Sequence, residues 1–229
     1  MATVGLLLLL GFAVSSHAES QPTAARQILP ELQTYPLPPS LGPIAPGDDY
    51  FDQVDQKNPA GSLIWSQFPV TIALDLANSS EPREAAWLQA VRSAITDWQV
   101  YLPLAEITDV TQANIVVRRA GVPLRRDKTT GQLHRARFAE TRYRFFVDEA
   151  QRLRHQMTIA LSPNQADASL LAGIRHELGH ALGIWGHSDR PTDIMYFSQV
   201  AKPPAISDRD RRTLQRVYQQ PTRIGGLMR

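Results

Sequence analysis

The sequence contains no cysteine among its 229 residues, which excludes disulfide bonds and every metal site built on thiolate ligands. Stability must therefore come from a hydrophobic core, together with any metal that other side chains hold. Net charge is also small, at +2, and hydrophobic residues make up 43% of the chain. This composition is typical of a globular protein rather than of a disordered or fibrous one.

Long hydrophobic runs are missing after the N-terminus, so no later segment has the length needed to cross a membrane. Residues 1–18 carry a short apolar run that ends at the small-residue site Ser16-His17-Ala18. This pattern indicates a cleavable secretory signal peptide, and the run is short for a membrane anchor, which is the alternative interpretation. We therefore expect a secreted protein, periplasmic or extracellular, without stable membrane insertion.

Positive charge is concentrated in one block of the chain. Residues 118–154 hold 11 basic and 4 acidic side chains, whereas residues 1–117 hold 4 basic and 12 acidic ones. Such a block is usually a solvated face, and no nucleic-acid-binding motif accompanies it. We expect no nucleic acid partner.

Proline separates an N-terminal segment from the rest of the chain. Residues 19–59 contain eight of the 17 prolines, a composition that favours extended, poorly packed chain, and we interpret this segment as a linker or pro-segment. One domain is expected at residues 60–220, followed by a C-terminal tail at residues 221–229. We find no internal repeat.

Hydrophobic patterning predicts a series of short strands. Three β-prone runs occupy residues 69–75, 113–118 and 156–161, and the alternating segment 135–146 is expected to form a hairpin or an edge strand. A helix between successive strands implies a crossover connection, and crossovers join parallel strands. The sequence therefore predicts an α+β fold with a twisted, mixed and mostly parallel sheet.

Three helices are expected around this sheet. The first begins after residues 79–82, and its apolar stripe consists of Trp87, Val91, Ala94, Ile95 and Trp98. The second covers residues 168–183, with Leu171, Ile174, Leu178 and Ala181 on one side. The third runs from Ser207 to about Tyr218, with Asp210 at the position of a capping box.

The most informative segment is His-Glu-Leu-Gly-His-Ala-Leu-Gly at residues 176–183. Residues four apart lie on the same face of a helix, so His176 and His180 can bind one ion while Glu177 lies beside it. Zinc with three protein ligands keeps a fourth position for water and lowers the pKa of that water to ~7. Glu177 is then placed to act as general base and to return the proton to the leaving amine. Two histidines alone would also suit a structural site.

The third ligand must come from the chain after this helix. His187 is the only histidine there, and Asp189 and Asp193 are the competing ligands. We expect His187, because imidazole suits zinc and because Gly183 and Gly186 allow the chain to bulge before it.

Three motifs together resemble the matrixins, a family of metzincin metalloproteases: residues 176–183, Gly186-His187-Ser188-Asp189 and Met195-Tyr196. The resemblance covers roughly residues 65–220 and implies a metzincin-like zincin fold, in which a backing helix, an active-site helix and a C-terminal helix accompany the sheet. It implies a zinc-dependent metalloendopeptidase that acts on protein or peptide substrates, and we expect it to be a monomer.

The resemblance also assigns roles to residues. It implies that His176, His180 and His187 bind Zn²⁺ and that Glu177 is the catalytic base. Met195 would form a hydrophobic floor beneath the metal without binding it, and the segment at Tyr196 and Phe197 would form a wall of the specificity pocket.

The sequence departs from the matrixin pattern at several points. One residue is inserted around Trp185, so His187 follows Gly183 by four residues instead of three. No cysteine supplies the thiolate that keeps many matrixins latent, and Phe197 stands where astacins and serralysins have an additional tyrosine. Matrixins often carry a further structural zinc or calcium site in the region of His134 and His155. Neither histidine has ligand motifs nearby, and we interpret both as surface residues.

Two other functions share part of this motif. A gluzincin-type peptidase takes its third ligand from a downstream glutamate, and no glutamate follows Glu177. A secreted zinc-binding protein of the same fold without catalytic activity is the second alternative, although a structural site has no need of Glu177.

Two hypotheses concern charged segments. The acidic run Asp48, Asp49, Asp52 and Asp55 could place a carboxylate on the zinc and keep the enzyme latent, or it could be a solvated linker. The basic block at 118–154 includes the expected edge strand, along which matrixins bind substrate, and would then favour acidic residues in the cleaved peptide.

Overall fold

The computed structural model describes residues 29–76, 83–122, 126, 129–132, 137–198, 200 and 202–229. The expected signal peptide, the start of the first helix at residues 79–82, and His134 lie outside the described residues. The regular elements are η1 (Pro39–Leu41), η2 (Phe51–Gln53), β1 (Val70–Asp75), α1 (Glu84–Gln99), β2 (Leu104–Ile107), β3 (Ile115–Arg119), β4 (Ala139–Val147), β5 (Leu153–Leu161), α2 (Asp167–Ala181) and α3 (Asp208–Tyr218). Within the described part of the chain, no helix is long and apolar enough to span a membrane.

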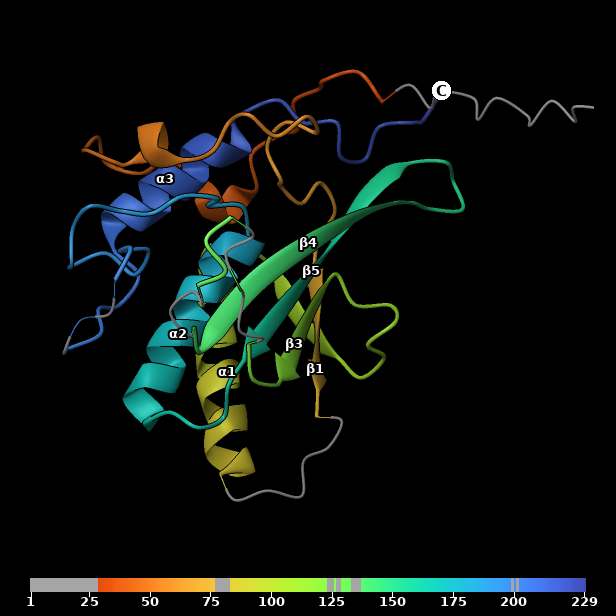
Figure 1. Ribbon diagram of the computed structural model, residues 1–229. Coiled ribbons are helices and arrows are strands. Elements are labelled where there is room, and N and C mark those ends of the chain that lie inside the picture. The colour runs from red at the N-terminus through yellow and green to blue at the C-terminus, as the bar shows by residue number, and fades with distance from the viewer. Residues whose placement is uncertain are drawn as a thin grey trace, which may run out of the picture.

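Five strands form one sheet in the order β2-β1-β3-β5-β4. Figure 1 labels β1, β3, β5 and β4 of this sheet, with α1 and α2 beside them. The strands β1, β2, β3 and β5 run parallel, and β4 pairs antiparallel with β5 at one end of the sheet. The predicted α+β fold with a mixed, mostly parallel sheet is therefore confirmed. The pattern did not predict β2, because four residues that include the charged Glu106 give no recognisable alternation.

The helices pack through the stripes that hydrophobic spacing predicts. All five residues expected on the stripe of α1 are buried, as are Ile174, Leu178 and Ala181 of α2. Leu170 completes the stripe of α2 in place of the expected Leu171, because Leu170 lies four residues before Ile174 and so on the same face. The capping box of α3 is also present, with the Ser207 hydroxyl accepting from the Asp210 backbone N–H.

The described part of the N-terminal segment is extended but well packed, so the expectation of poorly packed chain is wrong there. Leu41, Tyr50 and Phe51 are buried in the main core. The segment runs alongside α3 (Figure 1), and the Gln215 side chain of that helix donates to the Leu41 carbonyl at 2.7 Å. A few well-placed apolar residues are thus enough to attach a proline-rich chain.

The C-terminal tail packs beside this N-terminal segment. Thr222 and Ile224 are buried, and Thr222 pairs with Gln33 of the N-terminal segment in a two-residue β-bridge. The Leu153 backbone N–H at the start of β5 donates to the Gly226 carbonyl at 2.9 Å. The C-terminal tail is therefore fastened to the sheet, and the N-terminal segment is fastened to the tail.

His155 is a core residue, which corrects its interpretation as a surface histidine. It is only 2% exposed, and its ring stacks on Trp65 with centroids 3.9 Å apart. The strand begins at Leu153, earlier than expected, and alternate residues of β5 point into the core. His155 belongs to the inward set together with Met157 and Ile159.

Candidate metal centre and its cleft

A cleft of about 780 Å³ lies between β4, α2 and the chain that follows α2. Its lining includes all four residues of the expected metal centre, together with Tyr196 and Phe197. The edge strand contributes the residues from Ala139 to Thr141. The cleft therefore joins the most distinctive motif of the sequence to the edge of the sheet.

The three histidines converge in this cleft. His176 and His180 stand one helical turn apart on α2, and His187 returns to them from the following loop. One ring nitrogen of each residue lies within 4.8 Å of the corresponding nitrogens of the other two. The structure thus brings together the three residues that the sequence singled out.

Two of the rings are held in one tautomer by backbone carbonyls. His176 Nδ1 lies 2.9 Å from the Ile194 carbonyl, and His180 Nδ1 lies 2.7 Å from the Ile184 carbonyl. A carbonyl can only accept, so each Nδ1 carries a proton, and in the neutral ring Nε2 then keeps its lone pair for a metal. Fixing the second ring nitrogen in this way is a common support of histidines that bind metals.

Burial keeps the imidazoles of His180 and His187 neutral. It lowers the pKa of His180 to about 3, and it lowers the pKa of His187 to about 4, with the positive charge of His176 as a second cause at both. Neutral imidazole is the form that binds a metal ion. Three imidazoles with one shared focus form a donor set that suits zinc.

The competing ligands do not reach the histidines. Asp193 is 1% exposed, and its carboxylate accepts from Ser188 at 2.5 Å and from Ser207 at 2.8 Å. The Asp189 carboxylate accepts a hydrogen bond from the Arg209 guanidinium instead. Neither aspartate belongs to the group of candidate ligand atoms that the three histidines form among the described residues.

The inserted residue before His187 is accommodated by the N-terminal segment. Gly186 pairs antiparallel with Val54, and the Asp55 backbone N–H donates to the Trp185 carbonyl at 2.8 Å. A Cβ on Gly186 would lie 2.2 Å from the Gln53 carbonyl oxygen, so only glycine fits here. An isolated β-bridge therefore holds the bulge, and the N-terminal segment helps to place the third histidine.

Glu177 occupies the position next to the histidines that a general base requires. It is 9% exposed, and the Thr141 hydroxyl of β4 donates to Glu177 Oε2 at 2.6 Å. Burial raises the pKa of Glu177, whereas the positive charge of His176 and the bond from Thr141 lower it. Sequence reasoning missed Thr141, because its role depends on how β4 crosses α2 and no local pattern marks it.

Met195 lies against the helix that carries the histidines. It is fully buried, and a Cβ on Gly179 would come within 2.2 Å of the Met195 sulfur. Gly179, which lies one residue before His180, therefore leaves room for the Met195 side chain. Tyr196 and Phe197 follow at the cleft wall with ring centroids 4.5 Å apart, and Phe197 is 65% exposed.

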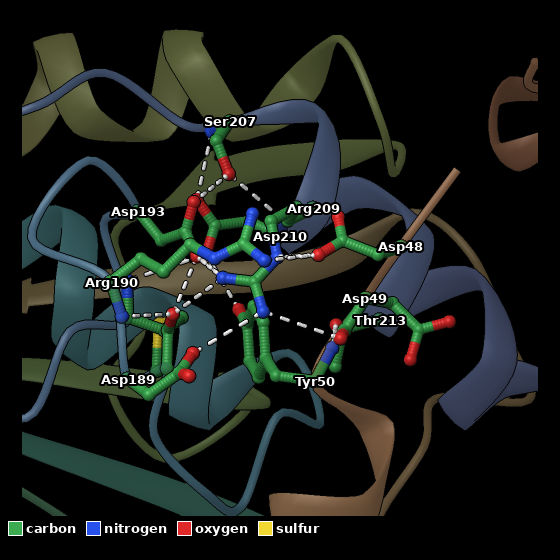
Figure 2. A network of polar contacts seen from close by, with 12 residues as sticks. Asp48, Asp49, Tyr50, Asp189, Arg190, Asp193, Ser207, Arg209, Asp210 and Thr213 are labelled. Carbon is green, nitrogen blue, oxygen red and sulfur yellow. Dashed lines mark hydrogen bonds and ion pairs between the residues drawn. The ribbon is translucent and has the colours of Figure 1, made fainter.

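A polar network centred on Arg209 of α3 holds the loop after His187 (Figure 2). The Arg209 guanidinium forms ion pairs with Asp193, Asp189 and Asp48. It also donates to the Ser188 hydroxyl at 3.1 Å. One buried arginine therefore ties α3 to the N-terminal segment and to both ends of the 188–193 loop.

The acidic run of the N-terminal segment is used in such contacts rather than at the histidines. Asp48 pairs with Arg190 at 2.6 Å, and Asp49 pairs with Arg216 at 2.8 Å. Asp55 accepts from the Lys57 backbone N–H, and Asp52 lies 3.9 Å from Arg216. None of these carboxylates belongs to the group of candidate ligand atoms that the three histidines form, so the structure does not place one where it could bind the zinc.

Comparison with protein families gives a match over most of the chain. The family model described as Matrixin matches residues 64–219, a range that includes the whole sheet, the three helices and the three converging histidines. No curated protein matches the chain significantly.

Proposed function

Because the chain belongs to the matrixin family of zinc-dependent metalloproteases, we propose that it is an endopeptidase that hydrolyses peptide bonds in the cleft beside α2. The observation that carries the proposal is the convergence of His176, His180 and His187 within reach of Glu177. A site with a purely structural metal has no need of an acidic side chain at this position. The open cleft likewise suits a polypeptide substrate.

Zinc held by the three imidazoles would polarise the substrate carbonyl and acidify the attacking water. Glu177 would take the proton of that water as it attacks the carbonyl carbon, and would then deliver it to the nitrogen of the leaving amine. Thr141 fixes one oxygen of the carboxylate, so the group is oriented before substrate arrives. The carbonyls of Ile194 and Ile184 hold the two helical imidazoles throughout.

We also propose that the protein is secreted. The support is the short apolar run and the small-residue site at Ser16-His17-Ala18. N-terminal sequencing of the protein exported by its host tests this: a mature chain that begins at Glu19 supports secretion, and retention of Met1 on protein inside the cell contradicts it.

Hydrolysis of denatured casein, followed by mass spectrometry of the fragments, tests the proposed activity. We expect cleavage at internal peptide bonds, loss of cleavage with a zinc chelator, and recovery when about one equivalent of zinc is restored. The same assay on Glu149→Gln, a change in the β4–β5 turn, should match the unmodified protein. Zinc binding without any cleavage would favour the alternative, a binding protein that has the fold but no catalytic activity.

A further inference from the structure

A row of aromatic side chains leads away from the metal centre along β4. The Trp185 ring stacks near His180, with centroids 5.7 Å apart, and meets the Tyr143 ring edge-on at 5.0 Å. The Tyr143 ring lies 5.3 Å from the Phe145 ring. The row therefore continues from a histidine of the cleft to a point well along the edge strand.

Strand alternation places this row on the face of β4 that continues the cleft. Thr141, Tyr143 and Phe145 alternate along the strand, so their side chains share one face. Thr141 on this face contacts Glu177. Phe145 pairs with His155, which points into the core, so this is the inner face of the sheet.

The side chains in the second half of β4 are exposed to solvent, whereas those of its first two residues are buried. Ala139 and Glu140 are buried, whereas Tyr143 is 40% exposed and Phe145 is 38% exposed. Exposed aromatic side chains that adjoin one another are common in sites that bind other molecules. The row adjoins the cleft through Trp185, which lines it, and Trp185 and Tyr143 also line a second, small pocket of about 30 Å³.

The backbone of β4 is open as well. This strand lies at the end of the sheet, and of the described strands only β5 pairs with it. An extended peptide can add to such an edge as a further strand, with main-chain bonds giving affinity and side-chain contacts giving selectivity. The strand edge and the aromatic row therefore offer both parts of a peptide-binding surface.

We propose that Tyr143 and Phe145, with the free edge of β4, form an exosite for an extended apolar part of the polypeptide substrate, away from the scissile bond. The proposal rests on the proposed peptidase function. We name substrate as the occupant because the same strand, β4, lines the catalytic cleft and carries the aromatic row. Thr141 of this strand contacts the Glu177 carboxylate, and Phe145 follows four residues later. Four residues of strand span about 13 Å, so only substrates that extend roughly four residues past the cleft reach Phe145.

The test compares two fluorogenic peptides that share one cleavable centre. The short peptide ends two residues on either side of the scissile bond, and the long one adds six residues that include leucine and phenylalanine to each end. The quantity compared is the ratio of kcat/KM for the long peptide to that for the short one. Phe145→Ala is matched by Phe146→Ala, because Phe146 has the same 38% exposure but lies on the opposite face of β4.

We expect Phe145→Ala to lower this ratio roughly tenfold, as loss of a central aromatic contact commonly does, and Phe146→Ala to leave it unchanged. Thermal unfolding of both variants checks that each is folded, and Phe145→Leu should restore part of the ratio. An unchanged ratio in Phe145→Ala, or an equal fall in Phe146→Ala, overturns the exosite. A dimer that Phe145→Ala dissociates, with the ratio unchanged, would instead assign the row to a second copy.

Binding to the Glu177→Gln variant separates this proposal from the proposed function. If the unmodified protein cleaves neither peptide, the peptidase function fails, but the affinity of the long peptide for Glu177→Gln still reports on the row. Roughly tenfold weaker binding of the long peptide to Glu177→Gln/Phe145→Ala supports the exosite, and equal binding overturns it. If the short peptide is cleaved and the ratio does not depend on Phe145, the function stands and the exosite fails.

Discussion

His155 makes the stability of the protein depend on pH, because neither of its ring nitrogens has a partner among the described residues. Both nitrogens are buried, and the ring lies flat on Trp65. Burial lowers the pKa of His155 to about 3, and the neighbouring positive charge of Arg154 lowers it further in the same direction. The ordinary value that applies in the unfolded chain is 6.5.

The sign of the effect follows from proton binding. Between pH 6.5 and pH 3 the unfolded chain binds a proton at His155 that the folded chain does not, so stability falls as the pH falls through this window. Each pH unit below the unfolded value costs about 1.36 kcal/mol, which gives about 2 kcal/mol at pH 5. The loss is complete near pH 3, where the folded protein also takes up the proton.

Replacing His155 by phenylalanine isolates this contribution. His155→Phe keeps a ring against Trp65 and removes both the titration and the two unpaired nitrogens. Urea unfolding of both proteins at pH 7 and pH 5 gives four free energies of unfolding, and groups common to the two proteins cancel in the difference of differences. We expect the unmodified protein to lose about 2 kcal/mol more than the variant over this range. If the free energies of unfolding of the two proteins fall equally between pH 7 and pH 5, to within about 0.5 kcal/mol and with or without chelator, the reasoning is refuted.

Three further changes test the supports of the cleft. Thr141→Val should lower kcat roughly tenfold with little change in zinc content, since it removes one hydrogen bond to a charged group while keeping the shape of the side chain. Gly186→Ala should weaken zinc binding by about tenfold or more, whereas Gly121→Ala, where an added Cβ meets nothing within 4 Å, should not. Arg209→Met should cost about 3–5 kcal/mol of stability in urea unfolding, because it leaves Asp193 buried without its cation, and adding Asp193→Asn should recover part of the loss.

Each of these predictions has a clear contrary result. Unchanged kcat in Thr141→Val would mean that the hydroxyl does not orient the carboxylate. Equal zinc affinity in the two glycine variants would remove the contribution of the Val54 pairing to the third histidine. A loss below 1 kcal/mol in Arg209→Met would show that Asp193 does not depend on this cation.

Local motifs predicted much of this molecule. The spacing of His176 and His180 defines one helical face wherever the helix lies, and the capping box at Ser207 concerns only three consecutive peptide units. Strand and helix order then determined the mixed sheet, because crossover connections have few alternatives. These inferences held because each depends on contacts close in sequence or on a strong topological rule.

The features that sequence reasoning missed depend on distant contacts. Thr141 reaches Glu177 across 36 positions, and Val54 reaches Gly186 from a segment whose prolines indicated loose chain. His155 was assigned to the surface because the apolar run that signals β5 begins one residue later. A polar residue inside a strand gives no warning of its burial unless the strand boundary is already known.

The central claim is that Glu177 transfers protons at a zinc ion held by three histidines. Its most direct test is zinc content and peptide hydrolysis measured together on one preparation of Glu177→Gln, which keeps the shape of the side chain and removes the base. We predict about one zinc per chain, as in the unmodified protein, and hydrolysis reduced at least 10³-fold. Hydrolysis near the unmodified rate with zinc in place would contradict the account.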